Sequence, residues 1–173
     1  KLDIGLEELI TSTARAALNH AEIDPADIGG IWLGHFNAGI IDDAFAASLA
    51  LNTDPRLRWC PATRVENACA SGAAAIAAAS DALDAGRIRA ALVIGAEKMT
   101  HRSTAENTVC LSRGAYQAEE FNVTFPEIFA RFAQAYQSRF GNPLEAMAKI
   151  AAKNYANAFD NPLAQFHRAL DED

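Results

Sequence analysis

The chain carries the stretch VENACASGAAAIAAA at residues 65–79. Its residue types predict a short strand, a tight turn that contains Cys69, and a helix built from very small side chains. A cysteine beside the first turn of a helix lies close to free backbone N–H groups and to the positive end of the helix dipole. Because both features stabilise a thiolate, the stretch indicates Cys69 as a nucleophile.

Helices and strands alternate on both sides of this stretch. We expect helices over residues 6–20, 43–51 and 71–85, a single helical turn at 25–27, and strands over 31–36, 63–66 and 90–96. The first three turns of the 71–85 helix carry no polar face, so most of its surface is expected to be buried. The continuous apolar run at 90–96 is typical of a central strand. This alternation predicts an α/β fold.

The last part of the sequence is less regular. Residues 101–122 are polar and lack clear periodicity, which predicts a long loop. Two helices follow, over residues 126–140 and 144–157. The second of them is expected to bury an apolar stripe of Leu144, Met147, Ile150 and Ala151. We therefore divide the chain into a first domain, residues 1–99, and a mostly helical second domain, residues 100–173.

Composition and charge argue against several classes of protein. The 173 residues carry a net charge of −7 with scattered Lys and Arg, whereas a nucleic-acid-binding protein needs a basic face. No apolar stretch is long enough to span a membrane, and the first residues lack the apolar core of a signal peptide. The three cysteines, Cys60, Cys69 and Cys110, have no CxxC spacing, which predicts neither a disulfide framework nor a zinc site. We expect a reducing, cytoplasmic setting.

Four short segments, NACASG, GAEKMT, KNYAN and NPLAQF, resemble sequences of one known family. NACASG at 67–72 is similar to the Cys-x-Ser-Gly nucleophile motif of the thiolase superfamily, and GAEKMT at 95–100 follows at the spacing expected for that family. KNYAN at 153–157 and NPLAQF at 161–166 resemble part of the helical loop domain of sterol-carrier-protein-type thiolases and their bacterial and archaeal relatives. Those relatives commonly carry His where this chain has Tyr155.

The resemblance implies a particular α/β fold, a thiolase-like layered half of the order βαβαβαββ with a mostly helical loop domain. Residues 1–99 correspond to the thiolase N-terminal domain without its first strand, and residues 100–173 to part of the loop domain. The family's second half, which carries a catalytic histidine and a second catalytic cysteine, has no counterpart in this sequence. We therefore expect the chain alone to be incomplete for turnover.

The resemblance also implies a reaction. Cys69 is the catalytic residue that accepts an acyl group from a coenzyme A thioester, in thiolytic cleavage or Claisen condensation of 3-ketoacyl-CoA. Coenzyme A is a substrate, and no metal or redox cofactor is implied. Thiolases pair the strand before the nucleophile across a two-fold axis, so Thr63–Glu66 is expected to form a homodimer interface. Relatives in this subfamily associate with a small zinc-ribbon/OB-fold protein, which makes such a protein a candidate partner.

Other interpretations of the same residues stay open. Cys69 is alternatively a small buried side chain, the usual state of a free cysteine. The chain is alternatively a non-catalytic module that keeps a thiolase surface for assembly, or a thiolase-fold lyase or condensing enzyme. Asn67 is expected to order the turn through hydrogen bonds from its side chain to the backbone, and Gly72 to permit close approach to a ligand or to a neighbouring backbone.

Several further residues have ordinary explanations. His35 resembles a catalytic Gly-His turn only superficially, and we expect it to end a strand. Cys60 and Cys110 lack a Gly-rich signature and are not expected to act as a second catalytic cysteine. Arg113 and Arg131 are expected to be solvated charges on the surface, and binding of CoA phosphates is the alternative for each. We expect an aromatic stripe to pack in the core, with the lining of an acyl or pantetheine tunnel as the alternative. Its members are Phe125, Phe129, Phe132 and Tyr136.

Overall fold

The computed structural model describes residues 3–120 and 122–170. The chain is divided into two units. The first ends at Gly114, and the second begins at Ala115. This boundary lies later in the chain than the division at residues 99 and 100 that the sequence suggested. Helix α3 (Thr104–Ser112) accounts for the difference, because it belongs to the first unit.

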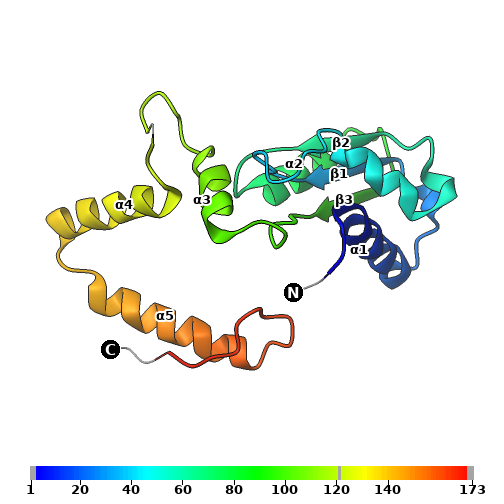
Figure 1. The fold of residues 1–173 in the computed structure, drawn as a ribbon. Helices are drawn as coiled ribbons and strands as arrows, with labels where there is room; N and C mark the ends of the chain where they lie inside the picture. The colour runs from blue at the N-terminus through cyan, green and yellow to red at the C-terminus, as the bar shows by residue number, and fades with distance from the viewer. Residues whose placement is uncertain (1–2, 121, 171–173) are drawn as a thin grey trace. The chain divides into compact units, whose positions relative to one another are not determined.

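A three-stranded parallel sheet forms the framework of the first unit (Figure 1). β1 (Gly30–Gly34) pairs with β2 (Ala62–Val65) on one side and with β3 (Ala91–Gly95) on the other. All three expected strands are present, in a mixed α/β fold. We expected residues 90–96 to form a central strand, but β3 lies at one edge of the described sheet, so this expectation is wrong. The connection between β2 and β3 crosses over β1, so that β1 lies in the middle.

α1 (Leu6–Ala21) forms where the sequence predicts a helix. Its buried side chains attach it to one face of the sheet, where they join Ile31 and Leu33 of β1 in the main core. These helix residues recur at helical spacing and are Leu6, Ile10, Ala14 and Leu18. Glu22, in the left-handed conformation at φ 54°, ends the helix by donating its N–H to carbonyls of the last turn.

Two short 3₁₀ helices differ in how well the sequence predicts them. η1 (Pro25–Asp27) is the expected single turn, and the Asp24 carboxylate caps it. The α-helix expected over residues 43–51 is instead the 3₁₀ helix η2 (Ala46–Thr53). No side chain caps η2, which begins after Phe45. Its buried alanines hold it against the core, so packing and not a capping residue fixes where it starts.

A third 3₁₀ helix, η3 (Pro55–Leu57), follows directly. The Asp54 carboxylate caps it by accepting the N–H of Arg56 at 2.9 Å. The guanidinium of Arg56, and then this backbone N–H, donate to the carboxylate and lower the pKa of Asp54 to about 2.

α2 (Ser71–Asp84) forms as predicted and packs across all three strands on the face of the sheet opposite to α1 (Figure 1). One side of the helix is buried and consists of Ser71, Ala75, Ala79 and Ala82. The other side is apolar and exposed, with Ile76 59% and Leu83 38% exposed. The expectation of burial on most sides is therefore wrong for the described chain, because the sheet covers only one side of the helix.

α3 (Thr104–Ser112) lies within residues 101–122, where the sequence predicts a loop. Ser103 and Glu106 form a capping box, in which the side chain of each residue accepts the backbone N–H of the other. The hydroxyl of Ser103, and then its N–H, donate to the Glu106 carboxylate and lower the pKa of Glu106. The Ser-x-x-Glu spacing is the signal that the loop prediction overlooked.

The second unit contains α4 (Phe125–Phe140) and α5 (Leu144–Phe159), at the two positions predicted. Thr124 and Glu127 form a capping box at the start of α4, and bonds from the Thr124 hydroxyl and N–H lower the pKa of Glu127. The side-chain Oδ1 of Asn142 accepts the N–H of Leu144 at 3.1 Å, which satisfies one donor at the start of α5.

The apolar side chains of this second unit lie on its surface. Among its described residues, 115–120 and 122–170, none is buried. The expected burial of a stripe on α5 is therefore wrong, since each of its members is exposed, namely Leu144, Met147, Ile150 and Ala151. On α4, Phe129 makes edge-to-face contacts with Phe125 and Phe132, yet the stripe is mostly exposed and forms no core within this unit.

Candidate active site

The chain turns sharply between the end of β2 and the start of α2. Ala70 N–H donates to Asn67 O at 2.8 Å, and Ser71 N–H donates to Ala68 O at 3.2 Å, which closes two successive turns. Ala68 has a left-handed backbone, with φ 44°, which is uncommon for a residue that carries a side chain. Cys69 follows it and is exposed.

Cys69 therefore has the two properties expected of it, exposure and a position beside the start of a helix. The alternative interpretation, a small side chain buried in the core, is wrong. The first N–H groups of an α-helix have no acceptor within the helix and are directed toward its N-terminal end. Negative charge that develops beside Cys69 is accordingly stabilised by the start of α2.

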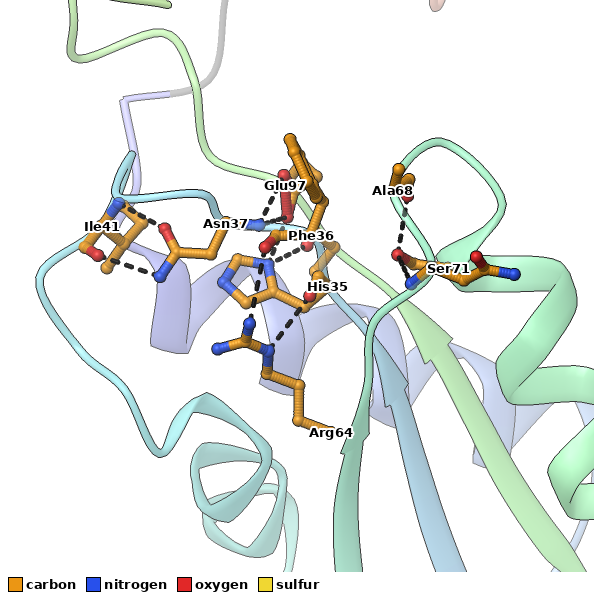
Figure 2. A network of polar contacts seen from close by, with 10 residues as sticks. His35, Phe36, Asn37, Ile41, Arg64, Ala68, Ser71 and Glu97 are labelled. Atoms are coloured by element: carbon orange, nitrogen blue, oxygen red, sulfur yellow. Dashed lines mark hydrogen bonds and ion pairs between the residues drawn. The ribbon is translucent and has the colours of Figure 1, made fainter. Parts of the chain in front are cut away.

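The buried hydroxyl of Ser71 fixes the turn. Its Oγ donates to Ala68 O at 2.7 Å and accepts the N–H of Asn67 at 2.9 Å (Figure 2). The Glu66 carboxylate accepts the N–H of Ala68 at 2.6 Å. We expected the Asn67 side chain to order this turn, but it is exposed, and Ser71 performs that role instead.

Ser71→Ala removes both hydrogen bonds of the hydroxyl and leaves Asn67 N–H without this partner, while Ala68 O keeps the backbone N–H of residue 71. We expect the free energy of unfolding, measured by chemical denaturation, to fall by about 1–3 kcal/mol. Ser80→Ala is the matched control, because Ser80 lies on the same helix and is exposed, so its change stays within about 0.5 kcal/mol. Equal losses for the two variants would contradict the assigned role of Ser71.

The backbone of β1 touches the start of α2. A Cβ added at Gly34 would lie 2.9 Å from Gly72 Cα and 2.9 Å from Ser71 O, distances that Cβ atoms essentially never show, so the backbone would have to shift. A Cβ at Gly72 would meet no described atom within 4 Å. We ascribed the close approach of two backbones to Gly72, but it is the missing side chain of Gly34 that lets β1 approach the start of α2. The missing side chain of Gly72 leaves open space beside the start of the helix.

A cluster of polar groups surrounds His35, which directly follows β1 as expected for a residue at a strand end. Its side chain is 1% exposed, and its Nδ1 lies 2.8 Å from Ala96 O and contacts the Glu97 carboxylate. That carboxylate also accepts the N–H of Asn37, at 3.2 Å. Figure 2 shows the cluster beyond the ends of the strands, at the edge of the sheet from which the Cys69 turn also emerges.

The other two cysteines differ from Cys69 in their exposure. Cys110 is buried within α3. Cys60 is half-buried, with its Sγ 3.4 Å from Ile28 O, and burial raises the pKa of the Cys60 thiol. All three cysteines lie in the described part of the chain, and among them Cys69 alone has an exposed thiol.

Two arginines considered as phosphate ligands make contacts within their own units. Arg113 donates to Ala38 O, and Arg131 donates to the Glu120 carboxylate at 2.6 Å. Within residues 3–120 and 122–170, no group of three or more His, Cys, Asp or Glu is placed to hold a metal ion. None of the helices described there has both the length and the apolar content needed to cross a bilayer.

Several known proteins are similar to this chain. The family described as "Thiolase, N-terminal domain" matches residues 2–170. Acetyl-CoA acetyltransferase of Methanothermobacter thermautotrophicus is 29% identical over 95% of this chain and 43% of its own length. The enzyme of that name from Methanocaldococcus jannaschii is 35% identical over 91% of this chain and 40% of its own length. Hydroxymethylglutaryl-CoA synthase of Methanosphaera stadtmanae is 30% identical over 94% and 54% respectively, so the chain spans about half the length of these relatives or less.

Proposed function

Since this chain belongs to the thiolase family, we propose that it acts in acyl transfer between coenzyme A thioesters, with Cys69 as the nucleophile. The observation that carries this proposal is the position of one exposed thiol, in a hydrogen-bonded turn directly before α2. The relatives named acetyl-CoA acetyltransferase favour an acetyl group as the group transferred.

In the first step, the Cys69 thiolate attacks the carbonyl carbon of an acyl-CoA thioester. A bond forms between the Cys69 sulfur and the acyl carbon, and the bond from that carbon to the CoA sulfur breaks. CoA leaves as a thiolate and takes up the proton that Cys69 released. N–H groups at the start of α2 provide positive potential for the oxygen that becomes negative during the attack.

In the second step, the acyl group leaves Cys69. A base removes a proton from the α-carbon of a second acyl-CoA, and that carbon attacks the acyl carbon. A carbon–carbon bond forms, the bond from the acyl carbon to the Cys69 sulfur breaks, and the Cys69 thiolate takes up a proton. The product is 3-ketoacyl-CoA, and the step is a Claisen condensation. The reverse sequence, in which the thiol of CoA attacks the acyl-Cys69 thioester after cleavage of 3-ketoacyl-CoA, is thiolysis. Coenzyme A is a substrate in both directions, and we propose no metal or redox cofactor.

A condensing reaction of another type is the second candidate. Similarity to a hydroxymethylglutaryl-CoA synthase over 94% of the chain favours it. The two candidates share the nucleophile and differ in product. The test uses a purified full-length protein, in which this chain is followed by the second half of the thiolase fold, supplied with acetyl-CoA and acetoacetyl-CoA. Hydroxymethylglutaryl-CoA as product supports the second candidate, whereas CoA-dependent loss of acetoacetyl-CoA to acetyl-CoA supports the first.

The partners follow from the same reasoning. β2 pairs with β1 alone among the described residues, so its other edge carries backbone groups free to pair with a second copy through Thr63–Glu66. We propose this strand as a homodimer interface, and a small zinc-ribbon/OB-fold protein as a further partner suggested by the family resemblance. A reducing, cytoplasmic location suits the three free thiols.

The test is mass spectrometry of the purified full-length protein after incubation with acetyl-CoA. We expect one acetyl group, held as a thioester on the Cys69 peptide and released by hydroxylamine. Absence of this adduct, or equal acetylation of Cys60 and Cys110, would count against the proposal and favour a non-catalytic module.

Alkylation at neutral pH gives a separate prediction. Iodoacetamide should label Cys69 at least about tenfold faster than Cys60 or Cys110, because exposure and the helix start both favour attack by its thiolate. Peptide mapping over a time course measures the three rates. Similar rates for all three cysteines would show that Cys69 is not activated.

A further inference from the structure

Residue 35 connects the ends of all three strands. The N–H of His35 donates to Val65 O, the last residue of β2, at 3.1 Å. The guanidinium of Arg64, also on β2, donates to His35 O at 3.1 Å. On the other side, the His35 ring bonds Ala96 O, directly after β3. Parallel strands end at one edge of a sheet, and ligand sites of α/β proteins lie at that edge.

The ring of His35 is oriented through one nitrogen. Nδ1 faces two acceptors, Ala96 O and the Glu97 carboxylate, so the chemistry of these partners assigns the proton to Nδ1. Nε2 is buried and has no hydrogen-bond partner among the described residues. The directional interactions of this side chain therefore all pass through Nδ1.

Glu97 holds a strained loop at the same time. Its two carboxylate oxygens lie 3.2 Å and 3.3 Å from the N–H of Asn37. Asn37 and Ala38 are both left-handed, with φ 60° and 50°, a conformation that costs free energy in residues with side chains. The Asn37 side chain then bonds the backbone of Ile41 at both its N–H and its carbonyl. One carboxylate thus ties the loop after β1 to the loop after β3.

This cluster is continuous with the turn that carries Cys69. Gly34, the residue before His35, approaches the start of α2 so closely that no Cβ fits between them. Phe36, the residue after His35, and Ala68 both lie within 4 Å of the position that a Cβ at Gly114 would occupy. Gly34 therefore lies against the helix start, and Phe36 and Ala68 both border Gly114. His35 lies between Gly34 and Phe36, so the bonds that hold His35 also restrain the backbone on either side of it.

We propose that His35 and Glu97 are a positioning pair that holds the Cys69 turn in the geometry required for acyl transfer. Neither residue touches the reacting atoms, and both act through the backbone of residues 34–36. The inference rests on the proposed function of Cys69. It assigns to this pair a role in the rate of acylation beyond its role in stability, because displacement of a nucleophile by about 1 Å can cost a hundredfold in rate.

The experiment measures acetylation of Cys69 in the purified full-length protein at several acetyl-CoA concentrations. His35→Leu retains bulk but loses the Nδ1 donor, and Glu97→Ala loses the acceptor. We expect each to lower the limiting rate about tenfold or more, with less than about a twofold change in the acetyl-CoA concentration at half-maximal rate. His35→Asn places an N–H donor near the position of Nδ1 and should restore the rate to within about threefold of the unsubstituted protein.

The double variant tests whether the residues act as a pair. Residues in one hydrogen-bond network are non-additive, so His35→Leu with Glu97→Ala should be no slower than the slower single variant. Cys110, buried in α3, reports on folding in the same samples, since its protection from iodoacetamide shows an intact first unit. The Glu97 side chain is 32% exposed, so Glu97→Ala keeps the test available if His35→Leu fails to fold.

Each outcome has a defined meaning. Unchanged acetylation in folded Glu97→Ala, multiplicative effects in the double variant, or no recovery in His35→Asn overturns the positioning pair and leaves Cys69 as the nucleophile. Failure of the unsubstituted protein to form acetyl-Cys69 overturns the proposed function, and with it the positioning role. Slow acetylation accompanied by rapid labelling of Cys110 shows a purely structural role and also overturns the inference.

Discussion

Cys69→Ala is expected to abolish acyl transfer while leaving the fold intact. The substitution removes the sulfur that forms the acyl thioester, and loss of the nucleophile in a covalent mechanism lowers kcat by about ten-thousandfold or more. Because the side chain is exposed, the free energy of unfolding should change by no more than about 0.5 kcal/mol. Steady-state thiolysis of acetoacetyl-CoA by the full-length protein, together with denaturant unfolding, measures both quantities.

Cys60→Ala is the control for this prediction. It removes a thiol of the same chemistry from a half-buried site next to β2, so kcat should remain within a few-fold of the original value. Cys69→Ser keeps a hydroxyl at the turn and should still be nearly inactive, since a hydroxyl is a far weaker nucleophile than a thiolate at neutral pH. Substantial activity in Cys69→Ala would refute the acyl-Cys69 intermediate.

Gly34→Ala is expected to have the second large effect. The added methyl group would lie 2.9 Å from two backbone atoms at the start of α2, so that the helix and the turn before it must shift. Overpacking against a backbone that cannot rotate away costs about 3 kcal/mol of unfolding free energy. The same shift moves Cys69, and we expect the rate of acetylation to fall about a hundredfold in molecules that remain folded.

Gly95→Ala is a closely matched control, because Gly95 pairs with Gly34 in the register of β1 and β3. A Cβ at Gly95 would meet no described atom within 4 Å. Thermal unfolding and the acetylation rate should therefore be close to those of the unsubstituted protein. If the two alanine variants behave alike, the contact between Gly34 and the helix start does not position the nucleophile.

The strand, the cysteine turn and α2 could be predicted because their signals are local. A β-branched residue before the turn, a lone cysteine and a run of alanines occupy adjacent positions in the chain, and helix propensity and dipole act over the same short range. α3 was missed although its signal is also local. The pairing of Ser103 with Glu106 outweighs the irregular polarity of the residues around it.

The His35 cluster could not be predicted in this way. His35 and Glu97 become neighbours only through the register that pairs Gly34 with Gly95, and residue types alone do not specify that register. The need for glycine at Gly34 likewise depends on where α2 crosses the sheet. The extent of burial on α2 and α5 was overestimated for a related reason. Apolar side chains along one side of a helix show that this side can pack against another element, but they do not show that this chain contains that element.

The left-handed backbone of Ala68 has a consequence for how this protein can be improved. A glycine at that position would adopt φ 44° without steric cost, so Ala68→Gly would relieve strain in the native state. It would also free the residue before the nucleophile to sample other conformations. Selection for heat resistance would therefore favour glycine at position 68, whereas selection for turnover would favour alanine. The same conflict occurs in other proteins whose active sites store strain.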